Sequence, residues 1–174
     1  MNEKNKKELM FILPKLQRYC YGLTGNKDQG DDLLHNSVVK ILSKFNLLKI
    51  ENFQAYMYKV ISNLWKDELR KKYKTKEIQV EDYIINQVPD NNNNFDKISY
   101  ISDHNKINQA IDTLTLKLRE VLILIVLEKK TYKEVSEILQ IPIGTVMSRL
   151  HEARRKILEN KDQNKLQKKI YEKN

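Results

Sequence analysis

Polar side chains recur at helical spacing between residues 145 and 155, where they could form hydrogen bonds to DNA. Because each residue of a helix turns by about 100°, Ser148 and Glu152 lie almost directly opposite the apolar Leu150. Such a face suits the major groove, where polar side chains meet base edges and arginines meet phosphates. Glu152 could accept a hydrogen bond from a cytosine amino group or pair with Lys156 one turn later, and both alternatives stay open. The residues expected to contact DNA are Thr145, Ser148, Arg149, His151, Glu152 and Arg155 of this segment and Lys133 upstream of it.

Two predicted helices must position that face. Thr131 occupies an N-cap position and Glu134 completes a capping box, which predicts a helix over residues 132–139. Residues 140–142, Gln-Ile-Pro, end it, and a second helix begins near residue 143. The apolar stripe of the second helix consists of Ile143, Val146, Leu150, Ala153 and Ile157. Two short helices joined by a tight turn predict a helix-turn-helix, and an αα-hairpin with a solvated charged face is the alternative.

The string GTV-x-SRL-x-x-AR at residues 144–154 resembles the end of region 4 in sigma factors of bacterial RNA polymerase, particularly the extracytoplasmic-function (ECF) class. The resemblance extends back through residues 132–135 to Leu114 and Arg119. It implies that the polar face binds the minus-thirty-five element of a promoter. Thr115, Met147 and Glu152 depart from the family pattern, which has proline, a basic residue and arginine there.

Three amphipathic helices are predicted upstream, over residues 7–23, from about residue 28, and from an Asn52 cap onward. Their apolar stripes are Leu9, Ile12, Leu13, Leu16 and Tyr19 in the first helix, Leu34, Val38, Ile41, Leu42 and Phe45 in the second, and Phe53, Met57, Val60, Ile61 and Leu64 in the third. The third helix ends in residues 70–76, where five of seven residues are basic. It therefore carries the positive charge that a polyanion would require.

These helices resemble sigma region 2. Residues 31–34, DDLL, are similar to the opening of the polymerase-binding helix, and residues 55–70 are similar to the family's Y-L-Y-x-I-A-x-N-x-x-x-D-x-x-R. The resemblance implies that the polymerase-binding residues are Asp31, Asp32, His35 and Asn36. It likewise implies that the residues at the melted minus-ten strand are Asn63, Lys66, Asp67, Arg70 and Lys71.

Three aromatic residues beside that stripe, Tyr56, Tyr58 and Trp65, could stack against unpaired bases. We expect Tyr56 to lie in the core instead, and for Trp65 both readings stay open. The N-terminal pattern LPKLQRY…LTGN…DD resembles the subgroup of ECF factors tied to the general stress response of alphaproteobacteria.

Charge divides the chain into parts. The net charge is +9 and the pI about 9.4, although residues 77–103 hold six acidic residues and one basic residue. We therefore expect basic domains at residues 1–73 and 106–160, an acidic flexible linker at 74–105 and a frayed charged tail at 161–174. A basic protein without a polyanion partner is the alternative reading of the composition.

Several function classes are disfavoured by the sequence. Cys20 is the single cysteine, so no internal disulfide or cysteine cluster can form, and the three histidines lack metal-ligand spacing. We find no phosphate-binding glycine loop and no catalytic motif, and therefore expect neither an enzyme nor a cofactor. The longest apolar run, residues 121–127, is too short to span a bilayer, and we expect a cytoplasmic protein without membrane insertion.

The sequence as a whole predicts an all-α, two-domain sigma factor that binds core RNA polymerase and promoter DNA and helps to open the duplex. An anti-sigma factor is expected as a further partner. One alternative is a sigma-like decoy that sequesters an anti-sigma protein, which a fused receiver domain would favour; we see none in this sequence. Another is a free-standing helix-turn-helix regulator that binds DNA as a dimer, but it leaves residues 1–73 unexplained.

Overall fold

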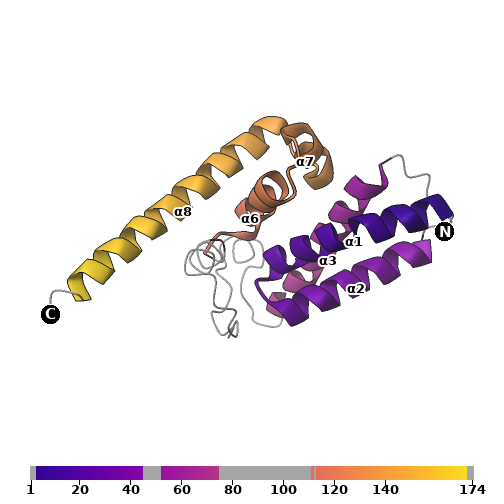
Figure 1. Cartoon of the computed structure of the whole chain (residues 1–174), viewed down its shortest axis with the longest axis horizontal. Coiled ribbons are helices and arrows are strands. Elements are labelled where there is room, and N and C mark those ends of the chain that lie inside the picture. The colour runs from indigo at the N-terminus through magenta and orange to yellow at the C-terminus, as the bar shows by residue number, and fades with distance from the viewer. Residues whose placement is uncertain (1–2, 45–51, 75–110, 112, 172–174) are drawn as a thin grey trace.

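Helices make up nearly all of the regular structure in the computed structural model, which describes residues 3–44, 52–74, 111 and 113–171 (Figure 1). The elements are α1 (Glu3–Thr24), α2 (Lys27–Lys44), α3 (Phe53–Lys74), α6 (Leu116–Leu122), the π-helical segment η2 (Ile123–Leu127), α7 (Tyr132–Leu139) and α8 (Ile143–Tyr171). No strand occurs in the described part of the chain. The all-α prediction is therefore confirmed, whereas the predicted linker lies almost entirely outside the described residues.

Helices α1, α2 and α3 form an N-terminal bundle, in which each helix packs against the other two. Gly25, with a φ of 66°, ends α1, because a left-handed residue there costs little without a side chain. Asn52 caps α3 as predicted, since its Oδ1 accepts a hydrogen bond from the Ala55 N–H at 3.0 Å. Burial raises the pKa of the Cys20 thiol to about 12, so this residue is an inert part of the core.

Helices α6, α7 and α8, with η2, form a C-terminal unit. The capping box is present, because Thr131 Oγ1 accepts from the Glu134 N–H while the Glu134 carboxylate accepts from the Thr131 N–H at 2.8 Å. Gln140 adopts a left-handed conformation and ends α7. The buried stripe of α8 is shorter than predicted. Val146, Leu150 and Ala153 are buried, but Ile143 is 45% exposed at the first residue of the helix and Ile157 is half-buried.

The apolar segment after residue 116 is not one continuous α-helix. Leu122 is followed by a π-helical turn, in which the Glu128 N–H donates to the Ile123 carbonyl at 3.0 Å. Because a π turn holds more residues than an α turn, it rotates the later side chains. Val126 and Leu127 therefore become about half exposed, whereas Glu128 becomes buried.

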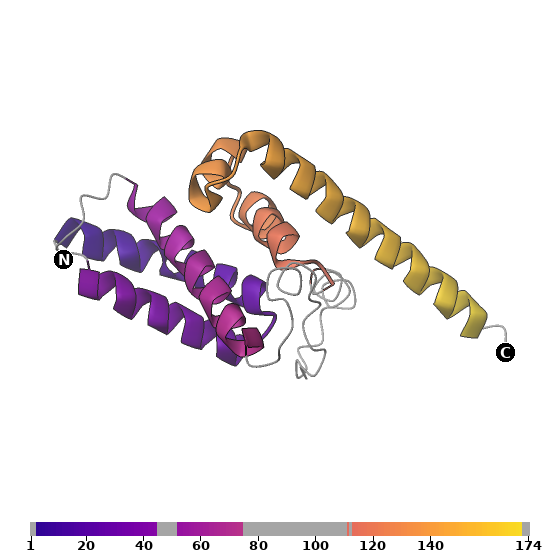
Figure 2. The ribbon, with the colours of Figure 1, turned by 180° about the vertical axis from the view of Figure 1, so that it is seen from behind.

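Helix α8 extends to Tyr171 and runs away from the rest of the molecule (Figure 2). Fraying of the tail after residue 161 stays a prediction, although its backbone is helical as far as residue 171. The physical reason is that residues 160–171 contain no glycine or proline and several strong helix formers.

The N-terminal bundle and the C-terminal unit contact each other. Helix α1 touches α6 and η2, and α3 touches α7. Between α1 and η2, a Cβ atom built on Gly22 would lie 2.7 Å from Ile123 Cδ1. This spacing leaves no room for a side chain at position 22 without movement of Ile123.

The capping box predicts a pH-dependent stability. The pKa of Glu134 is held below its ordinary value, first by the Thr131 N–H and also by Lys130. A carboxylate with a lowered pKa stabilises the fold above its ordinary pKa, and this contribution is lost as the pH falls through the folded-state pKa.

We expect Glu134→Gln to lower the free energy of unfolding at pH 7, with a difference from the unmodified chain that shrinks at pH 3. Urea unfolding at both pH values measures this. Glu137→Gln, an exposed carboxylate in the same helix, is the control. An equal loss for Glu134→Gln at both pH values would contradict the role of its charge.

Candidate nucleic-acid interface

One face of α8 gathers the polar residues that the sequence placed in the major groove. Ser148, His151, Glu152 and Arg155 are exposed, while Thr145 and Arg149 are half-buried. The opposite face packs against α6 and α7, with α7 carrying the exposed Lys133 near its start. The geometry is therefore that of a helix-turn-helix with an open second helix.

Several of these side chains have partners on α8 itself. The Ser148 hydroxyl donates to the Thr145 carbonyl at 3.1 Å, and Arg155 Nη1 lies 2.6 Å from Glu159 Oε1. Glu152 Oε1 lies 3.6 Å from Lys156 Nζ, which is the pairing left open as an alternative to base contact. Exposed pairs of this kind contribute only a few tenths of a kcal/mol. The Glu152 pair is therefore weak enough to be exchanged for a contact with DNA.

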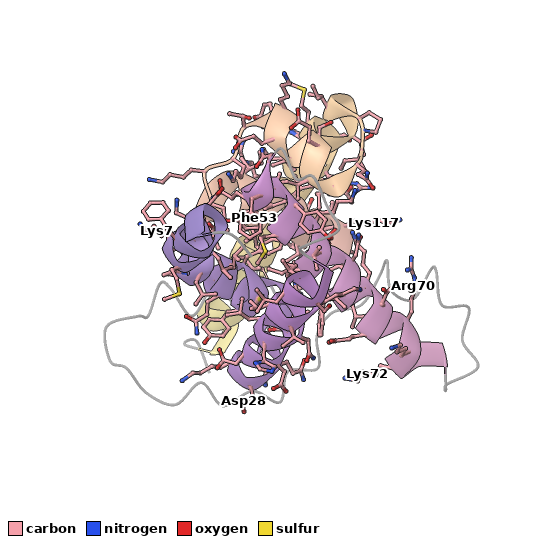
Figure 3. All side chains as sticks on the ribbon, turned by 90° about the vertical axis from the view of Figure 1, so that its right-hand side faces the viewer. Lys7, Asp28, Phe53, Arg70, Lys72 and Lys117 are labelled. Atoms are coloured by element: carbon pink, nitrogen blue, oxygen red, sulfur yellow. The ribbon has the colours of Figure 1, made fainter. Side chains whose placement is uncertain are left out.

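The residues expected at the minus-ten strand lie on α3 but do not share one open face. Asn63, Asp67, Arg70 and Lys71 are exposed, and Arg70 Nη1 lies 3.2 Å from Asp67 Oδ1. Lys66 is half-buried and turns toward the C-terminal unit. Figure 3 shows Arg70 and Lys72 projecting from the end of α3, toward the same side of the molecule as Lys117 of α6. Positive charge from both parts of the chain therefore faces one side.

Tyr58 does not lie on that face. Its side chain is fully buried, its ring meets the Tyr19 ring edge-on at 5.1 Å between centroids, and its hydroxyl donates to Glu128 Oε2 at 2.8 Å. Burial, followed by the bond to Glu128, raises the pKa of Tyr58 far above its ordinary value, so the hydroxyl stays protonated. The expectation that Tyr58 could stack against bases is therefore wrong for this conformation, because Tyr58 belongs to the α3 stripe that faces the C-terminal unit.

The other two aromatic residues, Tyr56 and Trp65, are half-buried and pack against the core. For Tyr56 this agrees with the expected core position. Trp65 also lines a cavity of about 280 Å³ between α2 and α3.

The residues expected to bind polymerase divide into two groups on α2. Asp31 faces α1, where its Oδ1 accepts hydrogen bonds from the Tyr21 hydroxyl at 2.6 Å and from Gln17 at 3.2 Å. The Tyr21 bond in particular lowers the pKa of Asp31. Asp32, His35 and Asn36 are exposed. Asp31 thus fixes the α1–α2 packing, and the other three remain available to a partner.

Both helices contribute polar residues to the cavity lined by Trp65. These are Asp32 and Asn36 of α2 and Glu68 and Lys72 of α3. Partial burial raises the pKa of Glu68, although its bond with Asn36 acts in the opposite direction. The cavity between α2, the predicted polymerase-binding helix, and α3 is therefore lined by the carboxylates Asp32 and Glu68 together with Lys72.

Sequence reasoning missed a group of buried charges in the C-terminal unit, namely Arg119, Glu120 and Glu128. Their signal was present, because they flank or interrupt the most apolar stretch of the chain. Charged residues are rarely fully buried unless they are paired, so such positions predict specific partners.

Within the described residues, no group of three or more histidine, cysteine or acidic side chains could hold a metal ion. The helices described have no stretch long and apolar enough to cross a membrane.

Two family descriptions match the chain. Residues 12–75 match Sigma-70 region 2, and residues 104–157 match Sigma-70, region 4. The first range contains the exposed residues of α2 and α3 considered above, and the second contains α6, η2, α7 and the polar face of α8.

Three similar proteins are ECF RNA polymerase sigma factors. SigW of Bacillus subtilis is 28% identical over 148 residues, which cover 80% of this chain and 79% of SigW. EcfG of Rhodopseudomonas palustris is 23% identical over 158 residues, which cover 90% of this chain and 84% of EcfG. SigE of Mycolicibacterium smegmatis is 26% identical over 145 residues, which cover 82% of this chain but only 56% of SigE.

The fold is similar to that of two solved proteins. The sigma factor RpoE of Bartonella quintana, in complex with the anti-sigma factor NepR, has a TM-score of 0.72 at 23% identity, with coverage of 92% of this chain and 98% of that one. The anti-anti-sigma factor PhyR of the same organism, complexed with NepR, has a TM-score of 0.55 at 15% identity, with coverage of 86% of this chain and 48% of that one.

The sequence strings, the helix-turn-helix with its open polar face, and the two family matches in the expected order agree with one another. The chain belongs to the sigma-70 family of RNA polymerase sigma factors, in its extracytoplasmic-function class.

Proposed function

We propose that this sigma factor binds core RNA polymerase through the exposed part of α2 and directs it to promoters with two separated elements. The observation that carries the proposal is that two open polar faces, on α3 and on α8, stand on the two parts that match regions 2 and 4. The candidate polymerase contacts are Asp31, Asp32, His35 and Asn36, of which Asp31 is also bonded to α1 and Asn36 to Glu68. We assign the chain no catalytic step of its own, and the cytoplasm as its compartment.

Each face has a different proposed task. On α8, Ser148, His151 and Glu152 address base edges of the minus-thirty-five element, and Arg149 and Arg155 bind phosphates. On α3, Asn63, Lys66, Asp67, Arg70 and Lys71 lie along the melted minus-ten strand. Lysine and arginine on both faces add affinity that depends on salt but not on sequence.

An anti-sigma protein is the proposed negative regulator. The support is the fold shared with RpoE, which was solved with the anti-sigma factor NepR. The N-terminal pattern LPKLQRY…LTGN…DD supports membership of the general-stress-response subgroup.

A decoy that sequesters an anti-sigma protein is the second candidate, favoured by the fold shared with the anti-anti-sigma factor PhyR. A sigma factor makes core polymerase initiate transcription at promoters, whereas a decoy binds the anti-sigma protein without starting transcription. Run-off transcription with core enzyme and a promoter library decides between them. A sigma factor yields discrete transcripts that depend on the added chain, whereas a decoy yields none.

The α3 face predicts a defect in strand opening. Asn63 and Arg70 are exposed two turns apart on α3. We expect Asn63→Ala combined with Arg70→Ala to reduce open-complex formation and to leave binding to core polymerase nearly unchanged. Permanganate footprinting measures opening, and a pre-melted template should restore activity.

The control for charge is Lys7→Ala, an exposed cation on α1. Failure of the pre-melted template to rescue the double variant would show that this face does not act on the melted strand.

The α8 face predicts two kinds of DNA defect. We expect Glu152→Gln to reduce discrimination at one base pair of the minus-thirty-five element by about 1–3 kcal/mol. The reason is that a carboxylate only accepts hydrogen bonds, as from the cytosine amino group, whereas the amide of glutamine also donates them. Arg149→Ala should weaken all promoters alike and lower the salt slope by about one. Competition binding over single-base variants at two salt concentrations measures both.

Glu159→Gln is the matched control, because Glu159 is also exposed on α8 and also pairs within the helix. A uniform loss across all base variants for Glu152→Gln would mean that Glu152 reads no base.

A further inference from the structure

Met147 is an exposed apolar side chain on the helix that carries the polar face. It is 52% exposed and lies four residues after Ile143, the first residue of α8. One turn before it, a Cβ built on Gly144 would meet no packing partner within 4 Å in the described part of the chain. A single exposed apolar residue is ordinary on a protein surface, so exposure alone indicates no function and the place of Met147 on the helix decides.

Burial along α8 rotates its open face toward Met147. With Leu150 as the reference, a turn of about 100° per residue places Met147 about 60° and His151 about 100° to one side. The same step places Thr145 about 140° and Arg149 about 100° to the other side. The first pair is exposed, whereas the second pair is half-buried. Met147 therefore lies on the open face, although the apolar stripe alone centres that face directly opposite Leu150.

The position of Met147 along α8 is that of a base-reading residue. In a helix-turn-helix, the residues near the N-terminus of the second helix contact base edges. Met147 lies in the second turn of α8, next to Ser148. Leu158 is more exposed, at 61%, but lies about 16 Å farther along the axis at a rise of about 1.5 Å per residue. Leu158 is therefore an apolar and exposed side chain that is remote from the base-reading end.

The side chain of Met147 suits a methyl group and not a hydrogen-bonding edge. Its thioether sulfur donates no hydrogen bond and is only a weak acceptor. The major groove presents the C5 methyl group of thymine, which apolar side chains contact. Burying the methionine against that methyl group removes apolar surface from water on both sides, which is favourable. Methionine at this place therefore favours thymine over the three bases that lack the methyl group.

The surroundings of Met147 suit DNA better than an apolar protein partner. The exposed side chains around it are Ser148, His151 and Arg154 and the apolar Ile143. Surfaces that bind apolar partners are contiguous apolar patches, whereas two apolar side chains among polar and basic ones make no such patch. Arginine and serine side chains beside it can bind phosphate oxygens and so place the helix in the groove.

We propose that Met147 reads a thymine of the minus-thirty-five element through its C5 methyl group. This rests on the proposed function, because it assumes that the open face of α8 enters the major groove at that element. It adds an apolar contact to the hydrogen bonds assigned to Ser148, His151 and Glu152. Since Met147 departs from the basic residue of the family pattern, the contact belongs to the specificity of this chain.

Replacement of thymine by uracil isolates the methyl group, because the two bases differ in that group alone. The experiment uses the polymerase holoenzyme formed with the full chain and selects a minus-thirty-five element from a randomised duplex library. Each thymine of the selected element, on either strand, is then replaced by uracil in turn. Competition binding at constant salt measures the affinity for each duplex.

Two variants remove an exposed apolar side chain from α8 at different places. Met147→Ala removes the proposed reader, and Leu158→Ala is the matched control beyond the base-reading end. A third variant, Met147→Arg, exchanges the apolar contact for one that suits guanine, because arginine donates to both O6 and N7 of that base. Circular dichroism and urea unfolding establish that each variant is folded.

We expect uracil at one position to weaken binding of the unmodified chain and of Leu158→Ala by about three- to fivefold, as the loss of one buried methyl group does. Met147→Ala should bind the thymine and uracil forms of that duplex equally. Met147→Arg should change the preferred base at the same position from thymine to guanine.

The proposal is overturned if the selected element holds no preferred thymine on either strand, or if uracil weakens binding at no position. It is also overturned if Met147→Ala keeps the uracil sensitivity of Leu158→Ala. In each of these cases the holoenzyme still selects an element, so the proposed function stands. A holoenzyme that selects no sequence contradicts the proposed function and, with it, the thymine contact.

Discussion

The burial of Glu120 and Glu128 against the N-terminal bundle is the contact on which the arrangement of the molecule depends. A carboxylate buried without partners is strongly destabilising, and the partners here are Ser62, Lys66, Tyr58 and Arg18 of the other part. The π turn of η2 matters because it rotates Glu128 into the interface. If the two parts were separated, the same two carboxylates would meet water, so the cost of desolvating them favours separation and their partners in the interface offset that cost.

This contact links the fold to the proposed function. Helix α3 serves as packing surface along one stripe and as a candidate DNA-binding surface along the next. Helix α8 is not constrained in this way, because its polar face stays open while Val146, Leu150 and Ala153 hold the opposite face on α6 and α7. The contact between the two parts therefore covers more of the proposed minus-ten surface on α3 than of the proposed minus-thirty-five surface on α8.

Local patterns in the sequence predicted local structure well. The capping box of Thr131 and Glu134, the Asn52 cap and the bounds of α7 follow from short-range chemistry, and the structure confirms them. The open face of α8 follows from helical periodicity in the same way. Tyr58 and Lys66 could not be placed, because their partners Glu128 and Glu120 lie about 50 to 70 positions away in sequence. The π turn was also missed, since nothing in an apolar run distinguishes it from an α-helix.

A double-mutant cycle between Tyr58→Phe and Glu128→Ala in the full chain tests the contact between the two parts most directly. Residues in one buried hydrogen-bonded network typically couple by about 0.5–3 kcal/mol, whereas residues more than about 10 Å apart are additive. Urea unfolding of the four proteins should give a coupling free energy within that range. Additive effects, with a coupling of zero within error, would contradict the contact between the two parts.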